Sequence, residues 1–263
     1  SMEGFCPIAS GSKGNCAYLG TRSCKLLIDL GISKQAVTEA LHSMGIHPED
    51  IQGIFVTHEH SDHIAGLRSF IKTYRTPIIC NIETARSLRQ LLDLCPTFKI
   101  FTTGHRFSLE DLRVQTFNVP HDAVDPVGFI FQYSGMKLGF CTDLGWVTSW
   151  ITHLLCDCDY LLIESNHDPE MVLRSSRPES CKQRILSKQG HISNAECGAL
   201  LQRVLTPRIK KIYLAHLSLE CNTAEQALNT VTSAIQEITD VHPVIAQSSG
   251  ITDPIFFSAP SLV

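Results

Sequence analysis

The pattern of apolar and polar residues switches repeatedly between two periods along the chain. Short apolar runs rich in β-branched or aromatic residues predict strands, whereas apolar residues spaced three and four apart predict helices. The predicted strands are Lys25–Leu30, Gly53–Thr57, Pro77–Cys80, Leu112–Val119, Val127–Tyr133, Lys137–Thr142, Tyr160–Glu164 and Lys211–His216. The predicted helices are Lys34–Met44, His63–Tyr74, Glu83–Leu94, Asn194–Leu205 and Thr223–Thr239.

These elements predict an α/β protein. A β-rich first half carries a few helices, and strands and helices recur after Gly145. Two sheets placed back to back, with helices outside, would bury all of the apolar runs. The chain has 263 residues, of which 43% are hydrophobic, so it fits one sizeable domain or two halves packed together. No repeat or linker divides it, and we predict a single domain over residues 2–263.

The composition indicates a reduced, non-membrane environment. No charged-then-apolar leader opens the sequence, and no apolar run approaches the roughly 18 residues that a membrane helix needs. The eleven cysteines are odd in number and accompany no secretion signal, which favours free thiols over a disulfide framework. We therefore expect a cytoplasmic protein.

One short segment concentrates metal-binding side chains. The residues His58, His60, Asp62 and His63 directly follow an apolar run and precede a helical pattern, so they occupy a strand-to-helix loop. His58 and His60 are two apart and point the same way in extended backbone. Asp62 and His63 follow where the chain turns, so one loop can serve two adjacent cations. Imidazole and carboxylate ligands suit Zn, Mn or Fe.

This segment resembles the HxHxDH motif of the metallo-β-lactamase superfamily. The resemblance implies a four-layer αββα sandwich with metal ligands at the ends of later strands, where His121, Asp143 and His216 stand. It also implies two divalent cations, of Zn or Mn. The first would be held by His58, His60 and His121, the second by Asp62, His63 and His216, and Asp143 would bridge them.

The predicted mechanism is hydrolysis by a hydroxide between the two cations. Metal binding lowers the pKa of water from about 15.7 toward 7, so that this nucleophile forms near neutral pH. The cations also neutralise charge that develops at the attacked centre. We assign Asp62 to orient the nucleophile or to take its proton.

Further segments resemble the YycJ/WalJ family within this superfamily. They are Ser10–Asn15, Glu164–Asp168, Gly190–Asn194 and Ala215–Asn222, and the resemblance spans essentially the whole chain. It implies a DNA exonuclease of the kind used in DNA repair, acting in the 5′–3′ direction. Within this interpretation His191 is a general acid for the leaving oxygen. The predicted substrate contacts are Ser12, Asn15, His167, Ser193 and Asn194.

Some of these residues also have plain structural interpretations. Ser193 and Asn194 fit the N-cap of the following helix equally well, and the two roles are compatible. His167 is an alternative metal ligand, although His216 fits the family order better. For Asp29, at the end of a predicted strand, we favour a simple turn over a functional role.

The charge distribution bears on the partner. The net charge is −4, but residues 166–211 carry nine Lys or Arg and four Asp or Glu, a local balance of +5. This segment contains two of the motifs above, where a polyanion would need positive charge, although solvated helix faces explain it equally well. We predict nucleic acid as the partner, DNA rather than RNA, and a homodimer is compatible with the sequence.

Three other functions compete with a DNA exonuclease. A small-molecule hydrolase of the same fold, such as a cyclic phosphodiesterase, thioesterase or lactonase, is the main alternative, because the superfamily motif does not fix the substrate. Diiron flavoproteins of this fold carry Glu where this chain has His60, which disfavours a redox function. A catalytically dead binding module is disfavoured because no ligand is missing.

Overall fold

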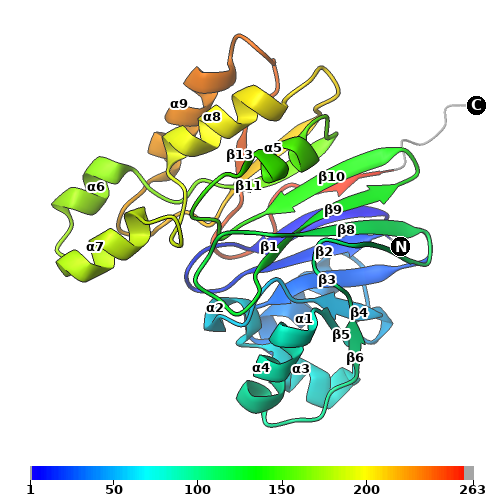
Figure 1. The fold of residues 1–263 in the computed structure, drawn as a ribbon. Coiled ribbons are helices and arrows are strands. Elements are labelled where there is room, and N and C mark those ends of the chain that lie inside the picture. The colour runs from blue at the N-terminus through cyan, green and yellow to red at the C-terminus, as the bar shows by residue number, and fades with distance from the viewer. Residues whose placement is uncertain (1, 258–263) are drawn as a thin grey trace, which may run out of the picture. The chain divides into compact units, whose positions relative to one another are not determined.

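The computed structural model describes residues 2–257, which form two compact units (Figure 1). Unit 1 comprises residues 2–114, 123–125 and 247–257, and unit 2 comprises residues 115–122 and 126–246. The assignment of all of these residues to a single domain stays a prediction. None of the helices within residues 2–257 combines the length and the apolar character that crossing a bilayer requires.

Unit 1 is built on a mixed sheet. Its order is β14 (Ile255–Phe256), β1 (Gly4–Ala9), β2 (Cys16–Gly20), β3 (Lys25–Leu30), β4 (Gly53–Phe55), β5 (Ile78–Cys80) and β6 (Phe98–Ile100). The pairs from β14 to β3 are antiparallel, and those from β3 to β6 are parallel. The parallel pairs are joined through helices, as parallel strands require.

The helices of unit 1 follow β3, β4 and β5. They are α1 (Lys34–Ser43), α2 (Ser61–Ile64), α3 (Leu67–Tyr74) and α4 (Ile82–Leu92), with a short 3₁₀ turn at Pro48–Asp50. Ser33 and Asn81 cap α1 and α4 through their side chains. Apolar residues of α1, α3 and α4, including Leu41, Phe70 and Leu88, share one core with the sheet.

The continuous helix predicted over His63–Tyr74 is wrong, because the chain forms two helices there. Gly66 stands between them and lies against the backbone near Ile32, where a Cβ would come within 1.7 Å of the Ile32 carbonyl oxygen. Gly66 N donates instead to Leu30 O at 2.9 Å. This close approach interrupts the helix and ties α2 to the end of β3.

Unit 2 is built on the second sheet. The order is β13 (Val244–Ile245), β12 (Lys211–Ala215), β11 (Tyr160–Glu164), β10 (Met136–Cys141), β9 (Val127–Tyr133), β8 (Leu112–Asn118) and β7 (Arg106–Leu109). The unit boundary falls within β8, so that β7 and the first residues of β8 are assigned to unit 1. The strands β10 to β13 are parallel. Residues that follow β10, β11 and β12 therefore lie at one edge of this sheet.

Helices cover one face of the unit 2 sheet in Figure 1. They are α5 (Ser149–Leu155), α8 (Asn194–Val204) and α9 (Ala224–Ile235), and their apolar residues form one core with β11 and β12. The short helices α6 (Pro169–Arg174) and α7 (Glu179–Leu186) lie to one side of this sheet. All eleven cysteines are unpaired, as predicted.

Candidate metal centre

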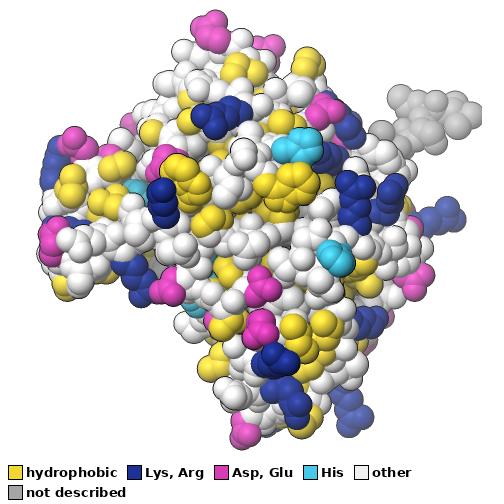
Figure 2. Space-filling view, in the orientation of Figure 1, with side chains coloured by type: hydrophobic (Ala, Val, Ile, Leu, Met, Phe, Trp, Pro, Cys, Tyr) yellow, Lys and Arg dark blue, Asp and Glu magenta, His cyan; other side chains and the backbone are white. Residues whose placement is uncertain are grey.

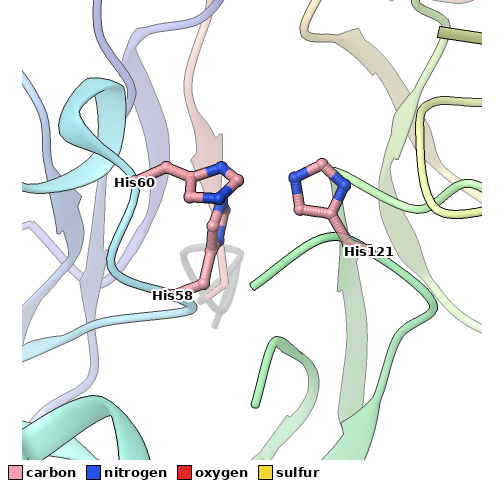
Figure 3. A group of neighbouring side chains, drawn as sticks. All are labelled: His58, His60 and His121. Atoms are coloured by element: carbon pink, nitrogen blue, oxygen red, sulfur yellow. The ribbon is translucent and has the colours of Figure 1, made fainter. Parts of the chain in front are cut away.

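The loop after β4 and the short helix α2 that follows it gather three imidazoles in unit 1. The rings of His58 and His60 lie 4.7 Å apart, measured between centroids, as their spacing in extended backbone predicts (Figure 3). The ring of His63 lies 4.1 Å from that of His58. His58 and His63 are buried, whereas His60 is partly exposed. The loop therefore presents a compact set of nitrogen donors.

A buried carboxylate, Asp29, fixes this loop from the end of β3. Its Oδ1 accepts a hydrogen bond from Thr57 N, and its Oδ2 accepts one from the Thr57 hydroxyl, both at 2.8 Å. The same Oδ2 lies 2.7 Å from His63 Nδ1. This contact leaves His63 Nε2 for another ligand, the arrangement typical of metal-binding histidines. The turn interpretation of Asp29 therefore missed an orienting role.

The Ser10–Asn15 segment also supports this loop. Asn15 N donates to Asp62 O at 2.8 Å. Its side-chain Nδ2 lies 3.2 Å from Asp62 Oδ2 and 3.3 Å from His63 Nε2. Asn15 is thus buried against two predicted ligands, whereas Ser12 is exposed. Phosphate contacts by Ser12 and Asn15 stay predictions.

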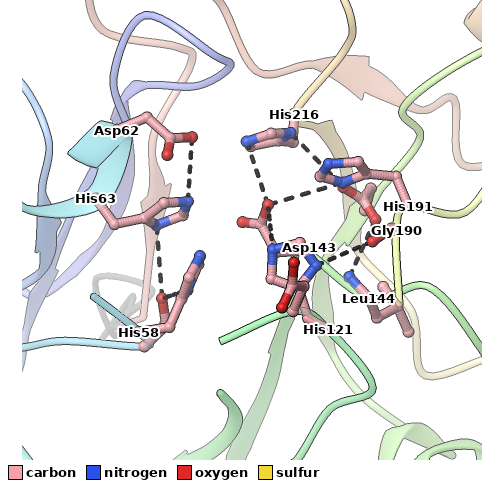
Figure 4. A network of polar contacts seen from close by, with 12 residues as sticks. His58, Asp62, His63, His121, Asp143, Leu144, Gly190, His191 and His216 are labelled. Atoms are coloured by element: carbon pink, nitrogen blue, oxygen red, sulfur yellow. Dashed lines mark hydrogen bonds and ion pairs between the residues drawn. The ribbon is translucent and has the colours of Figure 1, made fainter. Parts of the chain in front are cut away.

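In unit 2 the predicted ligands lie where strands end. His121 follows β8, Asp143 follows β10 and His216 follows β12. Asp143 Oδ1 lies 3.4 Å from His216 Nε2 and 3.7 Å from His121 Nε2 (Figure 4). His121 Nδ1 lies 3.0 Å from Gly190 O, so that its other nitrogen faces the carboxylate. The parallel strands thus bring together residues that are far apart in the sequence.

Glu164, at the end of β11, completes this group. Ligand atoms of Asp143, Glu164, His191 and His216 all lie within 4.8 Å of one another. Glu164 is fully buried, and its Oε1 lies 2.7 Å from His191 Nδ1. Its Oε2 accepts hydrogen bonds from Leu144 N and Ile192 N. No role was assigned to Glu164 from the sequence, although its place at a strand end beside Asp143 was a usable signal.

Burial and neighbouring charges act on these imidazoles in different ways. Burial lowers the pKa of His121 below its ordinary value, and Asp143 opposes this only in part. Burial also disfavours the charged form of His191, but the Glu164 and Asp143 carboxylates outweigh it and raise the pKa of His191 overall. Burial lowers the pKa of His167. The group therefore contains histidines in distinct electrostatic environments.

Three of these residues stand on unusual backbone. Asp29, Asp143 and His216 have φ values of 59°, 54° and 57°, in the left-handed region. Non-glycine residues occupy this region infrequently, although Asp and His do so more often than most others. Asp29 is the last but one residue of β3, Asp143 stands two residues after β10, and His216 directly follows β12.

The remaining predicted substrate residues form a buried polar network in unit 2. Ser193 caps α8 in a capping box with Glu196, which confirms the capping interpretation. Asn194 accepts from the Ser165 hydroxyl at 2.6 Å and exchanges amide hydrogen bonds with Asn222. His167 is buried. Substrate contacts by His167, Ser193 and Asn194 stay predictions.

The basic segment is largely compensated by nearby acids. Arg174 pairs with Glu170, Arg177 with Glu220 and Arg184 with Asp122, at 2.6 to 3.0 Å. Figure 2 likewise shows Lys and Arg side chains interspersed with acidic and apolar ones on the face in view. The local charge of +5 thus overstates the positive field of this segment.

The donor set of each unit fits a divalent cation. Imidazole nitrogens and carboxylate oxygens that converge within a few ångströms are ligands typical of Zn and Mn. In unit 2 the Gly190 carbonyl holds His121 and Glu164 holds His191. In unit 1 Asp29 holds His63. Such partners orient the ligands of metal sites. The buried His and Asp clusters are therefore consistent with a dinuclear metal site.

Comparison with known proteins identifies the family. Residues 25–217 match the model of the Beta-lactamase superfamily domain. The chain is a metallo-β-lactamase superfamily protein. It is 39% identical over 236 residues to Exodeoxyribonuclease YycJ of Bacillus anthracis, covering 89% of each chain. It is 36% identical over 234 residues to Exodeoxyribonuclease WalJ of Streptococcus pneumoniae, covering 88% of this chain and 87% of the relative.

A solved structure supports the same fold. The metallo-β-lactamase fold protein YhfI from Bacillus subtilis superimposes with a TM-score of 0.71 at 14% identity, covering 94% of this chain and 97% of that one. The predicted metallo-β-lactamase fold and the YycJ/WalJ resemblance are therefore confirmed. The relatives and the His/Asp clusters together also bear out the prediction that this superfamily member is an enzyme.

Proposed function

We propose that this protein is a metal-dependent DNA exonuclease that hydrolyses phosphodiester bonds in the 5′–3′ direction. The observation that carries the proposal is the 39% identity to Exodeoxyribonuclease YycJ, which spans 89% of both chains. The match is not confined to the motif around His58, so it favours the relative's activity over another hydrolase of the same fold.

The proposed cofactor is a pair of divalent cations, Zn or Mn. His58, His60 and His121 would hold the first, Asp62, His63 and His216 the second, and Asp143 would contact both. When bound, these cations would activate water and offset negative charge on the phosphate. The assignment uses the imidazoles and carboxylates that follow the strands of each unit. Asp29 holds the His63 ring, and Glu164 holds the His191 ring beside Asp143 and His216.

Two side chains of this site would move protons. Asp62 keeps a partly exposed carboxylate beside His63, with Oδ2 at 3.5 Å from Nε2, and would orient the attacking water or take its proton. His191 is held through Nδ1 by Glu164, so its Nε2 would carry a proton to the departing oxygen. Glu164 would keep the His191 ring in this orientation.

Digestion of end-labelled strands tests the proposal. Matched DNA and RNA oligonucleotides, labelled at either end, are incubated with the protein and Mn, Zn or Mg in turn. We expect mononucleotide release from the 5′ end of DNA and little cleavage of RNA. His58→Ala should abolish the activity, whereas His47→Ala, at an exposed histidine of unit 1, serves as the matched control. Turnover of a thioester or lactone in place of DNA would refute the proposal.

A further inference from the structure

Both tryptophans of the chain are exposed within one short stretch of unit 2. Trp146 is 46% exposed in the loop after Asp143, and Trp150 is 53% exposed in α5. Tryptophan is on average a highly buried residue, so an exposed pair calls for an explanation. Figure 2 shows hydrophobic side chains exposed over α5 and the preceding loop, with basic and histidine side chains beside them.

The two tryptophans differ in their surroundings. The Lys188 ammonium lies 4.4 Å from the centre of the Trp146 ring, so a cation accompanies an exposed aromatic surface. Trp150 instead stacks on His153, one turn further along α5, with ring centres 5.4 Å apart. Only Trp146 combines an exposed ring with a lysine that is itself exposed.

The backbone places this pair beside the candidate centre of unit 2. Trp146 follows Asp143 by three residues and Lys188 precedes His191 by three, so each Cα lies within about 11 Å of that residue's Cα. Gly145 N donates to Pro120 O at 2.7 Å, which fixes the Trp146 loop, and the backbone of Gly145 lies against the Lys188 loop. A Cβ on Gly145 would also meet Lys188 O at 2.4 Å and Gly190 N at 2.5 Å.

We propose that Trp146 and Lys188 form a subsite for one nucleotide of single-stranded DNA, in which the base stacks on the indole and its phosphate meets the ammonium. The inference rests on the proposed function and deepens it. Aromatic side chains bind single strands by stacking, because every base has a π-face. Lys188 lies over one face of the ring, so the base would take the opposite face, and the ammonium would supply the charge that the attached phosphate requires. A rigid loop next to the chemistry would hold the strand in register.

Tryptophan fluorescence gives a direct test, because each tryptophan can be observed alone. Trp150→Phe leaves Trp146 as the sole emitter, and Trp146→Phe leaves Trp150 as the matched control. The probe is a hydrolysis-resistant phosphorothioate single strand, added to the metal-loaded protein. We expect quenching in Trp150→Phe, little change in Trp146→Phe, and little quenching by an abasic strand. Bound DNA that leaves Trp146 emission unchanged, or equal quenching by the abasic strand, would overturn the inference.

Kinetics provide a second, independent measurement. Trp146→Ala should raise the KM for single-stranded DNA roughly 5- to 150-fold, the range of one stacked base, and leave kcat nearly unchanged. Hydrolysis of bis(p-nitrophenyl) phosphate, which has no nucleobase, should be unaffected. Lys188→Gln should make the slope of log affinity for DNA against log salt shallower by about 0.7, the value for one phosphate contact on a single strand. Lys210→Gln serves as its control and should leave this slope unchanged.

These outcomes separate the subsite from the function on which it rests. If Trp146→Ala lost activity equally on single-stranded DNA and on bis(p-nitrophenyl) phosphate, the subsite would be overturned and the exonuclease proposal would stand. The same holds if Trp146→Ala dissociated an oligomer of this protein without changing DNA binding. Wild-type protein that neither binds nor cleaves DNA would refute the exonuclease proposal, and the subsite with it.

Discussion

Replacing Asp29 by Asn tests how unit 1 prepares His63 for a cation. The variant keeps the shape of the side chain but exchanges one carboxylate oxygen for an NH₂ group. In the native chain the two oxygens face the Thr57 N–H, the Thr57 hydroxyl and His63 Nδ1. The Thr57 N–H can only donate, so the amide oxygen is needed there and the NH₂ group turns toward His63.

This exchange reverses the tautomer of His63. Its Nδ1 would accept from the amide, and the ring proton would move to Nε2, the atom that must be bare to bind a metal. Loss of such an orienting partner typically costs 10–100-fold in metal affinity, which corresponds to about 1.4–2.7 kcal/mol. A hydrogen bond to a charged group contributes roughly 1.5–3 kcal/mol, so both routes to the magnitude agree.

The assay is a competition titration of Zn or Mn against a chromophoric chelator. We expect one of two cations to bind roughly 10–100-fold more weakly in Asp29→Asn than in the wild type. Asp50→Asn is the matched control, because that carboxylate is exposed and lies 4.0 Å from Lys25 Nζ. Circular dichroism verifies that both variants are folded. Unchanged affinity in a folded Asp29→Asn protein would refute the tautomer argument.

Three further predictions concern the proposed ligands and the substrate. Asp62→Ala should lose or distort the second cation, and elemental analysis that still finds two tightly bound ions would contradict this. His191→Ala should keep both metals while kcat on DNA falls roughly 10²–10⁴-fold; the loss should shrink for a p-nitrophenyl leaving group, and an equal loss on both substrates would exclude a general acid. Replacing Arg174, Arg177 and Lys182 together by Ala should raise the KM for DNA. It should lower the slope of log affinity against log salt by less than about 2, the value for three phosphate contacts on a single strand. A larger fall would show that DNA displaces the acidic partners of the two arginines.

The strands around the site were predictable because they are nearly all apolar. β3, β9 and β11 match their predicted bounds, and five other predicted strands differ by one or two residues. The edge strands β6, β7, β13 and β14 were missed because they are short runs with exposed or partly exposed residues. The helices α6 and α7 were missed because they bury few apolar residues, so their periodicity is weak. The helix α5 was missed although it buries Ile151, Leu154 and Leu155, because its seven residues are too few to establish a period.

The residues of the candidate site that were predictable are those that belong to the HxHxDH motif and those that stand at the ends of predicted strands. The sequence places His58, His60 and His63 on one loop, and their rings are indeed close. It does not reveal Asp29 or Glu164 as partners, because their roles depend on which strands become neighbours. A carboxylate at a strand end has the same local pattern whether it closes a turn or holds a histidine.

At Asp143 and His216, which have left-handed backbone, selection for stability and selection for activity should favour different residues. An L-residue in this conformation is strained by roughly 1–2 kcal/mol, a cost that glycine avoids. A library of variants selected only for folding should therefore accumulate glycine at these two positions. A library selected for DNA cleavage should retain the carboxylate and the imidazole. Where these positions keep Asp and His, the chain has kept chemistry at the expense of stability.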